Sequence, residues 1–118
     1  MIDVFNLDEF TRQYLATALW STNHQDTEEP LDVDFDIDNF DEKSLQLMID
    51  DCGKFQQDNA SMIKGRESDA GHDFWLTRKG WGDGFWDDWP EHGDKLAEAS
   101  EAYDEVTLYA SDNEVFVI

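Results

Sequence analysis

The fold class is decided at the end of the chain, where residues 106–118 read Val-Thr-Leu-Tyr-Ala-Ser-Asp-Asn-Glu-Val-Phe-Val-Ile. Two short runs of strand-forming residues, 106–110 and 115–118, flank a polar tetrapeptide at 111–114. The central pair of that tetrapeptide, Asp112 and Asn113, suits a two-residue turn between antiparallel strands. The pattern therefore predicts a hairpin here.

Three helices are predicted upstream of this hairpin, from the spacing of apolar residues and from residues that can cap helix ends. The first starts at Leu7 with Asn6 as its cap and fades after Trp20. The second starts at about Asp41, and the third runs over 89–103 after the cap residue Asp88. The apolar stripe of the second helix consists of Leu45, Met48, Ile49, Cys52 and Phe55.

A second hairpin is predicted between these last two helices. Residues 72–79 are rich in strand formers, the glycines at 80, 82 and 84 mark a tight connection, and Phe85 and Trp86 begin a return strand. The whole chain, 1–118, is then one acidic globular domain of the α+β class. Its three helices pack on a small antiparallel sheet made of two hairpins.

Composition excludes several classes of function. The 118 residues include 29 acids and 8 Lys or Arg, giving a net charge of −21, while 40% of the residues are apolar and 14% are aromatic. Such apolar content indicates a folded protein rather than an acidic disordered tail. The charge opposes direct binding to nucleic acid or to an anionic membrane, because both need a basic surface.

Localisation and redox state are predicted from what the sequence lacks. Cys52 is the single cysteine, so neither an intrachain disulfide nor a Cys-rich zinc site is possible. The first residues lack the basic region of an export signal, and the longest apolar run is 115–118. We therefore expect a cytoplasmic protein.

The first notable set of carboxylates lies between residues 26 and 42, where there are nine acids and no Lys or Arg. Over 31–38 apolar and acidic residues alternate, so an extended chain would hold its carboxylates in a row about 6.6 Å apart. We call residues 26–41 the acidic segment. Its candidate partner-binding acids are Asp26, Glu28, Glu29, Asp32, Asp34, Asp36, Asp38 and Asp41.

The second set follows the predicted third helix and steps by three, four, three and four residues. This spacing places successive carboxylates about 5 Å apart on one helix face. Neighbouring like charges cost such a helix about 1 to 2 kcal/mol in total, and basic residues would relieve that cost. We call this set the acidic helix face: Glu91, Asp94, Glu98, Glu101 and Glu105.

Charge density connects both sets to DNA. A compact chain of this length is about 35 Å across. Duplex DNA carries one charge per ~1.7 Å of its axis, so 21 charges correspond to about 36 Å of duplex. The sequence therefore suggests a DNA mimic, in which the two acidic sets take the place of phosphates. The ordinary alternative is a solvated acidic surface that serves solubility.

Catalytic and metal-binding alternatives find weaker support. The spacing of the acids from Asp32 resembles the start of an EF-hand loop, but Ile37 stands where that loop needs glycine. A metal-dependent hydrolase could use Asp34, Asp36 and Asp38, although the net charge opposes a polyanionic substrate. Possible further ligands are His72, Asp73 and His92, although a packing or hydrogen-bonded role is more typical of His72. We expect no enzyme activity, no catalytic residue, no metal and no cofactor.

Aromatic residues offer another possibility, an acidic interaction domain whose contacts are made by exposed tryptophan. Tryptophan is enriched among the residues that dominate binding at protein interfaces. Core positions are the more typical ones, and base stacking without nearby cations would give little affinity for a nucleic acid. The residues in question are Trp75, Trp81, Trp86 and Trp89.

The chain resembles known groups of proteins in two respects. Residues 72–87, His-Asp-Phe-Trp-Leu-Thr-Arg-Lys-Gly-Trp-Gly-Asp-Gly-Phe-Trp-Asp, resemble a signature of small, uncharacterised phage- and plasmid-borne proteins. In size, acidity and single-domain organisation, the chain resembles the small monomeric bacterial DNA-mimic proteins, one group of which binds the histone-like nucleoid protein HU. The second resemblance implies a monomer that blocks the DNA-binding surface of HU. A restriction or CRISPR effector, as the target of an anti-defence protein, is the alternative partner.

Overall fold

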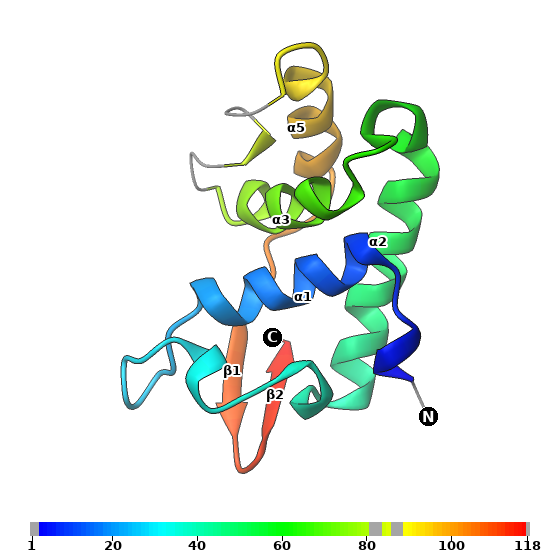
Figure 1. Ribbon diagram of the computed structural model, residues 1–118. Helices are drawn as coiled ribbons and strands as arrows, with labels where there is room; N and C mark the ends of the chain where they lie inside the picture. The colour runs from blue at the N-terminus through cyan, green and yellow to red at the C-terminus, as the bar shows by residue number, and fades with distance from the viewer. Residues whose placement is uncertain (1–2, 81–83, 86–88, 118) are drawn as a thin grey trace.

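The computed structural model describes residues 3–80, 84–85 and 89–117 (Figure 1). Its helices are α1 (Glu9–Ser21), α2 (Glu42–Ile63), α3 (Glu67–Arg78) and α5 (Gly93–Glu101), and its strands are β1 (Leu108–Ser111) and β2 (Glu114–Val117). Three short 3-10 turns complete the described elements: η1 (Val4–Asn6), η2 (Leu31–Val33) and η3 (Ile37–Asn39). The α+β class is confirmed. Within the described residues, however, four helices and one hairpin replace the expected three helices and two hairpins.

The C-terminal hairpin forms as predicted. Strands β1 and β2 pair antiparallel from Leu108 opposite Val117 to Ser111 opposite Glu114, which leaves a two-residue turn. Asp112 in that turn has a φ of 55°, a conformation that short polar residues tolerate. Val115 is fully buried, so the hairpin contributes to the core.

The predicted hairpin at 72–86 is wrong, because residues up to Arg78 belong to helix α3. Six consecutive residues of this helix, 73–78, are buried. A helix that is buried on all sides lacks the one-sided pattern of a surface helix, and its run of aromatic residues then looks like a strand. Of the predicted return strand, Phe85 is described and is buried. Trp86 and the predicted cap residue Asp88 lie outside the described residues.

Helices α1 and α5 begin later than expected, whereas α2 begins at the expected place. The side chain of Asp8 accepts a hydrogen bond from the Thr11 backbone N–H at 2.8 Å, so α1 begins at Glu9, two residues later than predicted. Helix α2 begins after its cap Asp41, as predicted. Its expected stripe is buried apart from the half-buried Ile49. Helix α5 begins at Gly93, after the turn that holds Pro90.

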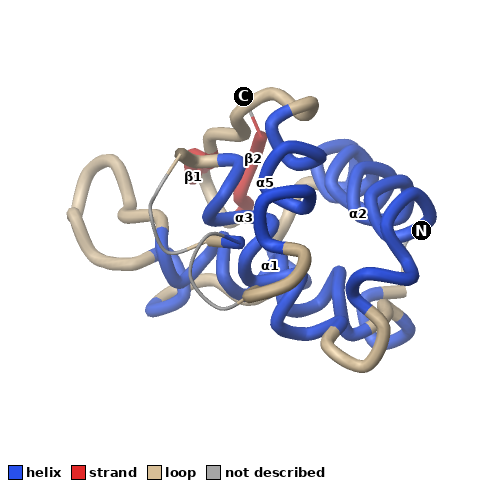
Figure 2. The backbone as a smooth tube through the Cα atoms, turned by 90° about the horizontal axis from the view of Figure 1, so that it is seen from above, coloured by secondary structure: helices blue, strands red, loops and turns tan. Residues whose placement is uncertain are grey.

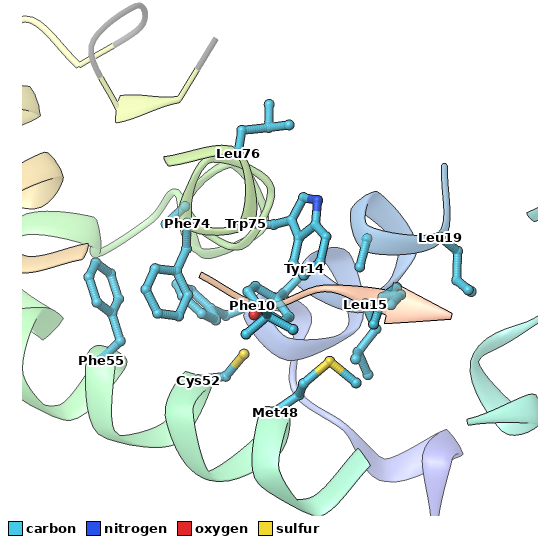
Figure 3. Packing of buried hydrophobic residues seen from close by; sticks show 14 of the residues in the cluster. Phe10, Tyr14, Leu15, Leu19, Met48, Cys52, Phe55, Phe74, Trp75 and Leu76 are labelled. Atoms are coloured by element: carbon cyan, nitrogen blue, oxygen red, sulfur yellow. The ribbon is translucent and has the colours of Figure 1, made fainter. Parts of the chain in front are cut away.

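Helices α1 and α3 cross at the centre of the molecule, with α2 alongside and α5 stacked on α3 (Figures 1 and 2). Their approach is close because residue 71 is glycine. A Cβ atom there would overlap the backbone carbonyl of Phe10. The core around this crossing is aromatic: Phe55 stacks on Phe74 with ring centroids 4.2 Å apart, and Tyr14 meets the edge of Trp75 (Figure 3).

One buried cation organises the polar part of this core. The Arg78 guanidinium donates to the Tyr14 hydroxyl at 3.1 Å, to the Asp51 carboxylate at 2.9 Å and to the Asp104 backbone carbonyl at 2.6 Å. Desolvation by burial raises the pKa of Tyr14 well above its usual range, although the nearby Arg78 charge acts in the opposite direction. Burial likewise raises the pKa of the Cys52 thiol, as expected for an inert core cysteine.

Overall dimensions agree with one compact body. The radius of gyration is 13.8 Å and the principal extents are 42 × 30 × 21 Å. None of the described helices combines the length and the apolar character that a membrane crossing requires.

Candidate protein-binding surface

The acidic segment does not run as the extended strand that its alternating sequence suggested. It folds into the 3-10 turns η2 and η3, joined at residues 34–36. The Leu31 carbonyl accepts hydrogen bonds from the backbone N–H groups of Asp34 and Phe35, at 3.3 and 2.9 Å. Asp36 caps η3 by accepting from the Ile37 N–H at 2.7 Å. Aspartate favours such local bonds over a strand, so the side-chain chemistry overrides the alternation.

The outward orientation of the carboxylates survives this change. Asp32, Asp34, Asp36 and Asp38 are all exposed. Three of the four apolar residues between them face the core as predicted, since Leu31 is buried and Phe35 and Ile37 are half-buried. The fourth, Val33, is 60% exposed. The segment therefore presents carboxylates together with one exposed apolar side chain.

The C-terminal hairpin holds both ends of the acidic segment in place. At one end, the Gln25 side-chain amide donates to the Ala110 carbonyl at 2.5 Å, and its oxygen accepts from the Ala110 N–H at 3.2 Å. At the other, the Asp41 N–H donates to the Val115 carbonyl at 2.9 Å. Between these points the Leu31 N–H donates to the Thr22 carbonyl at 2.8 Å. These bonds fix the backbone without neutralising any carboxylate.

Few of the 13 candidate acids have a cationic partner. Lys79 pairs with Glu105 at 2.9 Å, and His92 lies 4.0 Å from Glu91 and pairs with it only when protonated. The ion pairs found among the described residues include none of the other eleven candidates. Asp36 and Asp41 act as helix caps that accept hydrogen bonds from backbone N–H groups, which bring no positive charge. Most of the negative surface is therefore uncompensated.

The acidic helix face is shorter than expected. Asp94, Glu98 and Glu101 lie on α5 and are exposed, whereas Glu91 precedes that helix and Glu105 follows it. The buried residues of α5, Leu96, Ala97 and Ser100, form the opposite side. Figure 1 places α5 and the acidic segment at opposite ends of the molecule, with α1 and α3 between them. The two acidic sets are therefore separate surfaces, and they do not border a common groove.

Helix α1 and the acidic segment border an open hollow of about 440 Å³, lined by Ala16 and Leu19 of α1 and by segment residues 32–37 and 39. A smaller neighbouring hollow of about 240 Å³ shares Ala16 and Asp32 with it and is also lined by Trp20 and His72. Trp20 is 57% exposed. Sequence reasoning placed Trp20 at the end of the helical pattern and missed it as a contact residue. Its position four residues after Ala16, on the face opposite Leu15 and Ala18, was the available signal.

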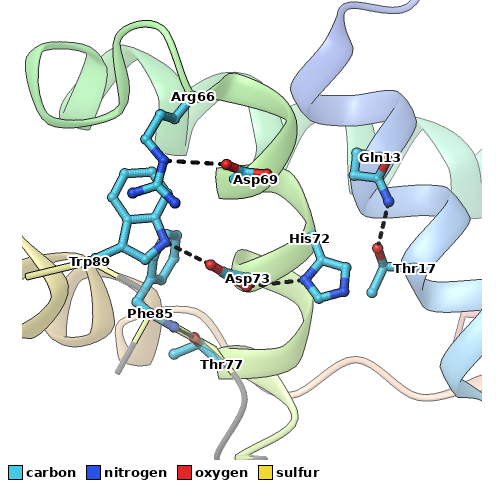
Figure 4. Close-up of polar contacts among 9 residues, drawn as sticks. All are labelled: Gln13, Thr17, Arg66, Asp69, His72, Asp73, Thr77, Phe85 and Trp89. Carbon is cyan, nitrogen blue, oxygen red and sulfur yellow. Dashed lines mark hydrogen bonds and ion pairs between the residues drawn. The ribbon is translucent and has the colours of Figure 1, made fainter. Parts of the chain in front are cut away.

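The histidine and tryptophan candidates around α3 form a structural network instead (Figure 4). Trp89 donates its indole N–H to the buried Asp73 carboxylate at 2.6 Å, and His72 Nδ1 lies 3.0 Å from the other Asp73 oxygen. The Arg66 guanidinium lies over the Trp89 ring, 3.9 Å from its centroid. Trp75 and Trp89 are buried, as expected of core residues, whereas Trp81 and Trp86 lie outside the described residues. In the part of the chain that the structure describes, no three His, Cys, Asp or Glu side chains are grouped to hold a metal ion.

Comparison with protein-family models, with curated proteins and with solved structures finds no match for this chain.

Proposed function

We propose that the protein is a DNA mimic, which occupies the DNA-binding surface of a basic DNA-binding protein and so inhibits or modulates its binding to DNA. The observation that carries this proposal is the acidic segment, whose candidate carboxylates are exposed apart from the half-buried Asp41, form no ion pair with another described residue and are held on a fixed backbone. Such a surface attracts the Lys and Arg side chains that otherwise contact phosphates. The greatest extent of the molecule, 42 Å, also compares with the ~36 Å of duplex that carries 21 charges.

The acidic segment is the primary contact surface in this proposal. The α5 end presents fewer carboxylates and lies on another side of the molecule, so one flat partner surface would not cover both. A histone-like HU protein is the first candidate partner, because its DNA-binding saddle and arms are basic. A restriction or CRISPR effector is the alternative for the same mechanism.

Displacement of DNA tests the proposal directly. The purified chain is titrated into a complex of HU and a fluorescently labelled duplex, and release of the duplex is followed by anisotropy. We expect release, with an affinity that falls steeply between 50 and 300 mM salt because the contacts are screened. Binding that neither competes with DNA nor responds to salt would contradict DNA mimicry.

A charge-matched pair of variants locates the surface. Asparagine at positions 32, 34, 36 and 38 removes four carboxylates from the acidic segment, and Asn at 36 retains the cap. The control places Asn at the exposed positions Asp50, Asp58, Asp69 and Asp112, so both variants have the same net charge. We expect the segment variant to release DNA at least tenfold less effectively than the control. Equal losses would favour the ordinary reading, a solvated acidic surface.

The identity of the partner needs its own experiment. Capture from a bacterial lysate, with and without competing duplex DNA, separates HU from a restriction or CRISPR effector. Capture of an effector in place of HU would change the partner and leave the mechanism intact.

A further inference from the structure

The strongest unexplained feature of the surface is apolar. Trp20 and Val33 are 57% and 60% exposed, whereas most other large apolar side chains among the described residues are buried. Both residues border hollows that share Ala16 and Asp32, one from helix α1 and one from the acidic segment. A surface that served only electrostatic mimicry or solubility would gain nothing from exposing them. Each of these two side chains offers apolar area at the edge of a hollow, where a bound segment would contact it.

Three hollows follow one another along α1, and we call them together the trough. Those at Trp20 and at Val33 share residues, and a third hollow, lined by Arg12, Ile37 and Asp38, shares Asp36 and Ile37 with the one at Val33. From Arg12 to Trp20 the helix advances about 12 Å, at 1.5 Å per residue. An extended polypeptide covers that distance with about four residues. The trough therefore has the length of a short peptide segment.

Charge defines what the trough accepts. Asp32, Asp34 and Asp36 line it along the acidic segment, and the nearest basic lining residue, Arg12, stands at its far end. Successive side chains of an extended peptide point to opposite sides, so alternate residues would face the apolar floor and the acidic rim. An acidic or purely apolar segment would leave these carboxylates desolvated without partners.

We propose that this trough between α1 and the acidic segment binds an extended polypeptide segment in which basic and apolar side chains alternate. An apolar side chain of that segment packs on Trp20, Ala16 and Val33, while neighbouring Lys or Arg side chains pair with Asp32, Asp34 and Asp36. The inference rests on the proposed function, since it names the element of the basic partner that is held. It adds an apolar contribution to affinity, which salt does not screen.

Two labelled hexapeptides probe the trough, one of alternating lysine and leucine and one of alternating lysine and serine. Both carry three lysines, so only apolar contacts distinguish them. Titration of the full chain is followed by anisotropy at 50 and 300 mM salt. We expect the lysine–leucine peptide to bind at least tenfold tighter, with a preference that is retained at the higher salt. Equal affinity for the two peptides overturns the inference.

Variants assign that preference to the trough. The double variant Trp20→Ala, Val33→Ser is expected to bind both peptides equally, while Leu47→Ser, a control at a residue 54% exposed on α2, keeps the preference. Val33→Ser alone changes an exposed side chain with little effect on folding, and we expect it to reduce the preference about threefold. Circular dichroism confirms that each variant is folded. A preference that survives in Val33→Ser and in the double variant overturns the inference.

The displacement assay separates the two proposals. If the double variant releases DNA from HU as well as the original chain while the segment variant fails, the trough inference is wrong and DNA mimicry stands. If the original chain prefers the lysine–leucine peptide but releases no DNA from any basic partner, the trough stands and DNA mimicry is wrong.

Discussion

The surroundings of α3 and the acidic segment use charge in opposite ways. Around α3, cations lie inside the molecule: Arg78 is almost fully buried against Tyr14 and Asp51, and Lys79 pairs with Glu105. In the acidic segment, the carboxylates lie outside and have no cation within the segment. Of the eight basic residues, Arg78 is therefore held in the interior, and Lys79 neutralises one exposed carboxylate, that of Glu105. Negative potential on the surface follows mainly from the excess of acids, and the burial of Arg78 adds to it.

The largest effect is expected where the cation is buried. Arg78→Met removes the donors to the Tyr14 hydroxyl, the Asp51 carboxylate and the Asp104 carbonyl, and it leaves the buried Tyr14 hydroxyl without this partner. We expect the free energy of unfolding to fall by about 3 kcal/mol. The matched change in the other region, Asp34→Asn, should stay within about 0.5 kcal/mol of the original chain. Urea unfolding measures both, and similar losses in the two variants would remove the contrast.

An intermediate effect is expected at two glycines. Gly71→Ala places a methyl group against the Phe10 carbonyl at the crossing of α1 and α3, and overpacking of this kind costs about 2 kcal/mol. Gly53→Ala on α2 has open space around the new methyl group and should stabilise the protein by up to about 1 kcal/mol. Thermal or urea unfolding shows whether each substitution stabilises or destabilises the protein. A stabilising Gly71→Ala would show that the helices do not approach closely there.

The smallest effect is expected from salt. Screening relieves repulsion among the exposed carboxylates, so 500 mM NaCl should raise the melting temperature of the free protein by about 2 to 5 °C relative to 20 mM. In the segment variant with four Asn residues, the rise should be smaller, because part of the repulsion is gone. Calorimetry measures both rises. A melting temperature that falls with salt would indicate that ion pairs outweigh repulsion.

Local signals predicted those elements whose formation depends on neighbouring residues. The start of α2 at about Asp41 and the turn at Asp112 and Asn113 were readable, because the signals for both act on a backbone a few residues away. The apolar stripe of α2 was readable because that helix has one exposed side. Helix α3 could not be predicted in this way, because other elements cover both of its sides. The role of Gly71 is a contact with Phe10 of α1, 61 residues earlier in the chain, for which the sequence carries no local signal.

The candidate surface was predictable in its chemistry but not in its shape. The exposure of the aspartates at 32–38 followed from alternation with apolar residues. Their arrangement depended on bonds such as Asp36 to the Ile37 N–H, for which alternation gives no signal. The hollow beside Trp20 depends on the packing of the acidic segment against α1. No pattern in the sequence predicts that these two regions are in contact.

The hydrogen bonds between Gln25 and Ala110 join residues 85 positions apart. During synthesis on the ribosome, the acids at 26–41 emerge well before the strands that position them. The nascent chain thus acquires its negative charge early and the final geometry of that charge only after β1 and β2 have paired. If the proposed function is correct, a basic partner that met the unfinished chain would encounter an anionic polypeptide without its final shape.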